Sequence, residues 1–492
     1  MSSAFWELFC VEHGIGPDGA SITLDGQPKA DFGEGRHVFY EETDCGGYSP
    51  RTVILDSEPL VIDEIRTGIY RTLFNPRRLI SGSDDAAGNY ARGFHHLATQ
   101  HSTKFDDSLR RVAEACDMLD GICFFHSYGG GTGSGLMMAL YDPIDEEYPK
   151  STIFDFGVYP DCDQAFSVLE PYNAVLGASS PCKPDCISLI FHNRAIINIY
   201  EREVAISNVT YSHLNRLVAQ VFSGLTAGLR FQASLTSGLG ELQTNLIPYP
   251  TMHYLMCSFY PFMSPAIYDA TSKPKTEVFI SCENPSQILT MQFGNFSLLI
   301  ITELANETML TEVLSDRFQL ALSDATFEDS VMLSCALLFR GDVSPSGINS
   351  AVEELKRSHK VTFADWCPCG YKASKRCCLQ PMSVIKATGM VSTPRCITSL
   401  YNGTLVKSTL TGIGDQFIVM NNKKAFYYWY LCEGMEENEF QEALDDFQSL
   451  MGDYEIIDQA AKSALNKVGC SIKNELTLKT IKMICTFIML PK

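Results

Sequence analysis

The chain has 492 residues, a formal net charge of −20 and an apolar share of 45%. This length is too great for one hydrophobic core and predicts two or three domains. The acidic balance argues against nucleic acid and anionic membrane surfaces as partners and favours basic ones. Eighteen scattered cysteines without a signal peptide predict reduced cytoplasmic thiols, and they lack the repeated spacing of zinc sites. The longest apolar stretch, 288–302, is too short and too interrupted to span a bilayer.

Short apolar runs alternate with helical patterns up to about residue 200. These runs predict strands at 53–55, 121–125, 153–158 and 187–191. Fully apolar strands separated by helices are typical of a parallel sheet covered on both faces, so we expect an α/β fold. Ligands of such sheets bind beyond the carboxyl ends of the strands.

A glycine-rich run, SYGGGTGSG at 127–135, directly follows the second of these strands. It has five glycines in seven positions, and the apolar run 136–140 comes next. This order predicts a strand, a tight loop and a helix whose N-terminus faces an anion, with backbone N–H groups around a phosphate. A flexible linker is the alternative, but linkers do not lie between two apolar runs. The run lacks the lysine of a Walker loop and the G-x-G-x-x-G of dinucleotide folds, which leaves little support for an oxidoreductase.

The second half of the chain mixes helical and strand patterns. Residues 214–229 have apolar positions at helical spacing, whereas 336–339 and 361–363 indicate strands. The apolar run 288–301 indicates an additional strand pair, or sequence that the gene does not normally translate. Near the end, five residues form one apolar helical stripe: Phe440, Leu444, Phe447, Met451 and Tyr454.

The order of motifs along the chain resembles the tubulin family, and its α type most of all. The resemblance extends from about residue 4 to about residue 458. Besides the glycine run, the matching segments are FWELFCVEHGI at 5–15, VIDEIRTG at 61–68, DAAGNYARG at 85–93, EPYN at 170–173, QTNLIPYP at 243–250, RGDV at 340–343, DWCP at 365–368 and WYLCEGMEE at 429–437.

The resemblance implies a structural GTP-binding subunit of microtubules, cytoplasmic and cytoskeletal, that pairs head-to-tail with β-tubulin. It implies a GTP-binding domain at 1–200, a mixed α+β intermediate domain at 201–402 and a C-terminal helical domain at 403–492. Motors and microtubule-associated proteins would bind the acidic C-terminal helices, where 433–458 has ten acidic residues and no basic one. GTP and Mg²⁺ are the implied cofactors.

The resemblance also assigns residues to the nucleotide. Asn193 and Asn215 match guanine-reading asparagines, whose amides offer both a donor and an acceptor to a base edge. Tyr211 matches the aromatic residue that stacks on the base. Glu58 matches an acid on the magnesium side, and a carboxylate suits an ion that is held partly through water. The phosphate contacts fall in the glycine run, at Ser127, Gly129, Gly130, Gly131, Thr132 and Gly133.

Glu241 matches the glutamate that α-tubulins insert into the nucleotide pocket of a neighbouring subunit, where β-tubulin has a lysine. It would orient and polarise the attacking water, so we expect a GTPase that acts in trans. We therefore expect Glu241 on the surface, on the opposite side from the chain's own nucleotide. A supporting acid of the family is absent, because Gly238 occupies its place.

Three departures from the family leave a second interpretation open. The chain begins about fifteen residues late, without the family's first strand and its phosphate loop. The region 265–308 is longer by roughly thirty residues. The segment 459–492 has six Lys and one Glu instead of an acidic tail. The alternative is a tubulin-derived binding protein that does not polymerise, or a truncated gene product, with impaired GTP binding.

Overall fold

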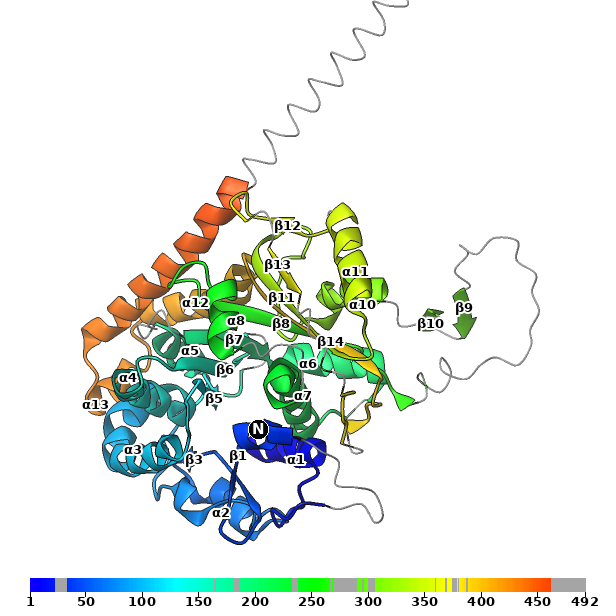
Figure 1. Ribbon diagram of the computed structural model, residues 1–492. Coiled ribbons are helices and arrows are strands. Elements are labelled where there is room, and N and C mark those ends of the chain that lie inside the picture. Colours follow the sequence, from blue (N-terminus) through cyan, green and yellow to red (C-terminus); the bar gives the residue numbers. More distant parts are fainter. Residues whose placement is uncertain are drawn as a thin grey trace, which may run out of the picture.

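The computed structural model describes residues 1–22, 33–162, 165–179, 186–206, 208–231, 238–265, 268, 290–293, 296–299, 306–358, 360–367, 370–373, 378, 380–385 and 388–461. The described part of residues 2–81 contains two α-helices, two 3₁₀ helices, a hairpin and a small parallel sheet (Figure 1). Its elements are α1 (Ser2–His13), η1 (Gly33–Val38), β1 (Tyr40–Glu42), β2 (Tyr48–Pro50), β3 (Ile54–Asp56), α2 (Pro59–Thr67), η2 (Pro76–Arg78) and β4 (Leu79–Ser81).

The main sheet has eight strands in the described part of the chain. Its order is β12-β11-β14-β8-β7-β6-β5, and β13 also pairs with β11. The strands β5 to β8 are parallel, and β14 is antiparallel to both of its neighbours. Their bounds are β5 (Gly121–Ser127), β6 (Thr152–Tyr159), β7 (Cys186–His192), β8 (Tyr254–Tyr260), β11 (Val331–Gly341), β12 (Thr362–Phe363), β13 (Tyr371–Ala373) and β14 (Arg395–Gly403). The expected α/β fold is confirmed, and the strands predicted at 121–125, 153–158 and 187–191 are β5, β6 and β7. The strand predicted at 53–55 overlaps β3, which pairs with β4 in a separate sheet.

Helices cover both faces of the parallel strands (Figure 1). Phe125 of β5 packs with Phe5 of α1 and Phe222 of α7, whereas Phe124 packs in the cluster of Phe105 and Leu140 on α3 and α4. The helical elements are η3 (Arg92–Leu97), α3 (Ala98–Glu114), η4 (Thr132–Leu136), α4 (Met137–Glu147), α5 (Glu170–Ala178), α6 (Asn193–Ile199), η5 (Tyr200–Val204), α7 (Tyr211–Arg230), α8 (Leu239–Leu246), α10 (Asn306–Val313), η6 (Asp316–Phe318), α11 (Pro345–Ser358), α12 (Leu405–Asn422), α13 (Tyr427–Cys432) and the helix 437–461.

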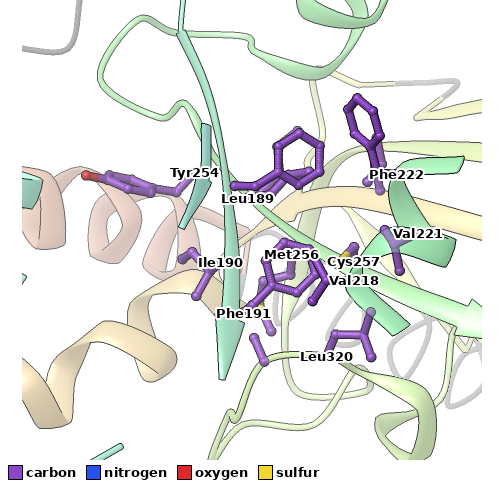
Figure 2. Close-up of a cluster of buried hydrophobic side chains, with 14 of the residues drawn as sticks. Leu189, Ile190, Phe191, Val218, Val221, Phe222, Tyr254, Met256, Cys257 and Leu320 are labelled. Carbon is purple, nitrogen blue, oxygen red and sulfur yellow. The ribbon is translucent and has the colours of Figure 1, made fainter. Parts of the chain in front are cut away.

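The alternation of side chains along β7 builds the centre of the core. Leu189 and Phe191 point toward α7, while Ile190 points to the other side of the sheet (Figure 2). All seven residues of β7 are buried, as expected for a central parallel strand. The helix predicted at 214–229 is α7, and it covers this face.

The C-terminal helices pack on the rest of the chain through the predicted stripe. Phe440 stacks on Tyr427 at a ring separation of 4.0 Å and meets the ring of Tyr172 on α5 at 5.2 Å. Leu444, Phe447 and Tyr454 are buried as well, and Met451 is half-buried. The stripe is therefore confirmed as the buried face of the helix 437–461.

The expected additional strand pair is present as β9 (Thr290–Phe293) and β10 (Phe296–Leu299), which pair antiparallel. Most of the long region 265–308 and the basic segment 462–492 lie outside the described residues. Of the helices that the structure describes, none is long and apolar enough to cross a bilayer.

A buried cluster of charges joins α1, α7 and β11. The Glu12 carboxylate lies 2.7 Å from the Arg230 guanidinium and 2.8 Å from that of Arg340. The Ser223 hydroxyl donates to the carboxylate and accepts from both arginines. Burial alone would raise the pKa of Glu12, but the two guanidinium charges outweigh it and lower this pKa to about 2. The contact therefore links the first helix to the second half of the chain.

Glu12→Ala would leave two buried cations without their counter-ion, so we expect a loss of about 3–5 kcal/mol in unfolding free energy. Because the folded pKa of Glu12 lies below its ordinary value, its stabilisation is present at neutral pH and is lost as the pH falls from about 4.5 to about 2. Denaturant unfolding across that pH range, with and without the substitution, measures both effects.

Glu7→Ala is the matched control, since Glu7 also joins α1 to α7 through Arg216 but remains partly exposed. There we expect a change of about 1 kcal/mol or less. Equal losses for the two variants would contradict the importance of the buried cluster.

Candidate functional site

The glycine-rich run forms the expected strand, loop and helix. β5 ends at Ser127, the loop covers 128–130, and the helical backbone begins at Gly131 and continues through η4 into α4. Ser127 and Gly130 are exposed at the carboxyl edge of the parallel strands. The helix N-terminus therefore faces an open surface, which is the arrangement that favours an anion.

The glycines of this run differ in the space around them. A Cβ on Gly131 would lie 2.5 Å from the Asn89 carbonyl oxygen, and one on Gly133 would lie 2.2 Å from that of Ser127. These glycines are required by packing. Gly130, by contrast, has no heavy atom within 4 Å of its Cβ position. The open side of the loop thus lies at Gly130, where a phosphate has room beside the backbone.

Asn173 on α5 holds the loop in this position. Its side-chain nitrogen donates to the carbonyls of Gly129, at 2.9 Å, and Gly88, at 2.7 Å. Its oxygen accepts from the Tyr90 N–H and from the Tyr430 hydroxyl. Asn173 is fully buried, so each of these bonds replaces a bond to water. Asn173 belongs to the EPYN segment, for which the sequence alone predicted no role. An asparagine within an otherwise apolar helix is the signal that pointed to it.

The magnesium-side candidate lies next to the loop. Glu58 follows β3 at the N-cap of α2, and the preceding Ser57 has its hydroxyl 2.7 Å from that of Thr132. Burial raises the pKa of the neighbouring Asp56 carboxyl. No group of three metal-binding side chains occurs among the described residues. These donors suit an ion that keeps much of its water and binds phosphate, as Mg²⁺ does.

The base-side candidates lie on two helices. Asn193 is half-buried at the start of α6, directly after β7, and so shares the carboxyl edge with Ser127. Tyr211 opens α7 with its side chain 61% exposed, and Asn215 follows one turn later. A capping box of Thr210 and His213 fixes this end of α7. An exposed ring at a helix start is available for stacking on a ligand.

Glu241 lies near the amino end of β5, whereas the glycine loop lies at its carboxyl end. It is exposed in the first turn of α8, as expected. The N-terminus of this helix is capped by Asp120, whose carboxylate accepts from the Leu239 N–H at 2.9 Å. Asp120 immediately precedes β5, whereas the glycine loop follows β5. Asp120 was not among the residues predicted from the sequence. Its carboxylate lies 3.1 Å from a Cβ placed on Gly238, the position that lacks the family's acid.

A sheet of this topology with a glycine loop at its carboxyl edge defines a nucleotide-binding protein. Two family models match the chain: the GTPase domain of the Tubulin/FtsZ family over residues 1–201, and the tubulin C-terminal domain over residues 298–414. The chain is 36% identical to the tubulin alpha-1 chain of Emericella nidulans, covering 95% of this chain and 96% of that one. It is 37% identical to the tubulin alpha-B chain of Neurospora crassa and 36% to the tubulin alpha-3 chain of Zea mays, with 92% and 93% of the two chains covered in each case.

The chain belongs to the tubulin family. Within this family it is an α-type subunit, a structural component of microtubules, and the expected GTPase-type domain and guanine-nucleotide binding are supported by the family match. The roles of the individual site residues remain predictions.

Gly130→Ala should weaken nucleotide retention roughly tenfold or more while the fold persists, because the new methyl group enters only the open side of the loop. The amount of nucleotide released when the purified protein is denatured measures retention. The midpoint of thermal unfolding measures whether the fold persists.

Gly133→Ala should instead destabilise the fold, since its methyl group meets the Ser127 carbonyl. Gly228→Ala in α7 has open space and controls for a general effect of replacing glycine. Unchanged nucleotide content in Gly130→Ala would refute the phosphate assignment.

Proposed function

We propose that this chain pairs head-to-tail with β-tubulin and holds GTP and Mg²⁺ at the carboxyl ends of its parallel strands. In this proposal Glu241 activates hydrolysis of the GTP on the neighbouring subunit. The domain limits 1–200, 201–402 and 403–492 are part of this proposal. The chain therefore acts as both a structural subunit and half of an active site.

The separation of the two ends of β5 carries the proposal. Asp120, which caps the helix of Glu241, precedes this strand, and the glycine loop follows it. Seven residues of strand span about 23 Å, far beyond the reach of a glutamate side chain. Glu241 therefore cannot act on the phosphates of its own subunit. In a head-to-tail pair, the phosphates of the neighbouring subunit would lie within its reach.

In its own pocket the chain would contribute binding rather than hydrolysis. The backbone of Gly129, Gly130 and Gly131 and the hydroxyls of Ser127 and Thr132 would hold the phosphates. Mg²⁺ would neutralise phosphate charge near Glu58. Asn193, Asn215 and Tyr211 would hold the base by hydrogen bonds and stacking.

The acidic outer helix suits motors and microtubule-associated proteins with basic surfaces. Glu436, Glu437, Glu442, Asp445 and Asp446 are exposed, and the segment 433–458 carries no basic residue. Their shared negative charge would steer basic partners to this face.

Co-expression with β-tubulin should yield a stable one-to-one heterodimer that contains bound GTP. Size-exclusion chromatography with nucleotide analysis measures both. Soluble chain that never associates with β-tubulin would contradict the proposal.

Glu241→Ala should leave the heterodimer and its bound nucleotide intact, because the side chain is exposed and remote from the glycine loop. GTP hydrolysis in the polymer should fall by roughly 10²–10⁴, the usual contribution of a positioned base. Phosphate release during assembly, and the rate of shrinkage after dilution, report the effect.

Asp120→Ala tests how Glu241 is positioned. Loss of the cap on α8 should lower hydrolysis less than loss of Glu241, and Asp120→Asn should recover part of the rate because its amide oxygen still accepts from Leu239.

Wild-type rates of hydrolysis and shrinkage in Glu241→Ala would contradict the catalytic role of Glu241.

The second candidate, a non-polymerising binding protein with impaired GTP binding, is favoured by one observation. β5 lies at the edge of the main sheet and is half-buried from Gly121 to Phe125. A phosphate loop on a weakly supported strand would bind nucleotide poorly. Purified heterodimer without bound GTP would favour this candidate.

A further inference from the structure

Tyr128 is the only aromatic residue of the glycine-rich run 127–135, and its side chain is turned into the protein. It is only 2% exposed, although Ser127 before it and Gly130 after it are exposed. Its N–H donates to the Val158 carbonyl of β6 at 2.9 Å. This N–H is therefore not available to a phosphate, and the contribution of Tyr128 to the loop must come from its side chain.

Three alternate residues of β6 accommodate this side chain. Asp155, Gly157 and Tyr159 lie on one face of the sheet, because every second residue of a strand does. The ring of Tyr128 stacks on that of Tyr159 at a centroid separation of 4.3 Å. It passes over Gly157, where a Cβ would lie 2.4 Å from a ring carbon. Its hydroxyl donates to Oδ2 of the buried Asp155 at 2.7 Å. One contact thus fixes the ring plane and another fixes its tip.

Helix α5 closes against the opposite edge of the same ring. A Cβ on Gly177 would lie 3.0 Å from Cδ1 of Tyr128. Asn173, one turn earlier on this helix, donates to the carbonyl of Gly129, which follows Tyr128 in the loop. The loop is therefore attached to the protein twice in succession, through the side chain of one residue and the backbone of the next.

Asp155 has a second partner that keeps its carboxylate in place. His126 is on β5, two residues before Tyr128, and its Nε2 lies 2.7 Å from Asp155 Oδ1. The rings of His126 and Tyr128 are 4.6 Å apart. All three side chains are more than nine-tenths buried. Hydrogen bonds to a carboxylate are strong in such surroundings, since water does not compete for it.

We propose that Tyr128, held by Asp155 and His126, sets the position of the phosphate loop and so determines how long the chain retains its nucleotide. The inference rests on the proposed phosphate contacts at 129–131, where three glycines have no side chain that could anchor them. A loop that is fixed before binding loses less entropy when the phosphates bind. Tyr128 is a positioning residue, because the group that it contacts is Asp155 and not the nucleotide.

Tyr128→Phe removes the hydroxyl and keeps the ring. The purified full-length chain is loaded with radiolabelled GTP, and loss of the label into excess unlabelled GTP is followed by filter binding. We expect release to become roughly tenfold faster. Tyr401→Phe is the matched control, since Tyr401 on β14 is also fully buried and hydrogen-bonded, to the Ser258 hydroxyl at 3.3 Å. Equal acceleration in the two variants would overturn the proposal.

Substitutions of Asp155 separate positioning from packing. Asp155→Leu should accelerate release as Tyr128→Phe does, whereas Asp155→Asn, which keeps an acceptor oxygen for the hydroxyl, should restore most of the retention. Tyr128→Phe combined with Asp155→Leu should release nucleotide little faster than either alone, because both remove the same hydrogen bond. Additive effects, or equal release from the Asn and Leu variants, would overturn the proposal.

Hydrogen exchange of the amides at 129–131 needs no nucleotide and keeps this inference distinguishable from the proposed function. Exchange should be faster in Tyr128→Phe than in Tyr401→Phe and the unmutated chain. Unchanged exchange would overturn the positioning role. Faster exchange in a chain that retains no GTP even when unmutated would support the positioning role and contradict the proposed function.

Discussion

The ion cluster of Glu12, Arg230 and Arg340 is the constraint on which the arrangement of this chain depends. Two guanidinium groups cannot remain buried without a carboxylate between them, so α1, α7 and β11 must meet at one point. Arg230 ends α7, and Tyr211 begins it. Fixing one end of this twenty-residue helix therefore also fixes where the base-side candidates lie relative to the sheet. The rings of Phe9 and Phe222 stack at a separation of 5.8 Å and add an apolar contact between α1 and α7.

A second constraint is the close approach of backbones around the glycine loop. Gly93, Gly131 and Gly135 each face a backbone atom at a distance that a Cβ could not occupy. The loop is thus shaped by its contact with residues 89–94, and Asn173 joins both segments to α13. Because residues 89–94 and Asn173 hold the loop on the side away from the ligand, its N–H groups keep their positions without a ligand. This preorganisation reduces the entropy that binding would otherwise cost.

Local patterns predicted much of the fold, and tertiary contacts decided the rest. The strands at 121–125 and 187–191 were found because buried parallel strands are continuous apolar runs, and the stripe of Phe440 followed from helical spacing. The exposure of Glu241 at the far edge was also predicted. The cap from Asp120 and the hydrogen bonds of Asn173 were not predicted, because each joins segments that are distant in the sequence. The composition of β5 is that of a central strand, so its position at the edge of the sheet was indicated only by the absence of the family's first strand, which is normally central.

The strand β5 connects these features. It runs from the cap of α8 to the glycine loop, so both functional ends depend on the position of the same seven residues. A strand that pairs on one side has half the ladder of hydrogen bonds that a central strand has, and it opens more readily. A movement of β5 would therefore displace the cap of α8 and the glycine loop together. The proposed roles of Glu241 and of the phosphate contacts depend in this way on how firmly one strand is held.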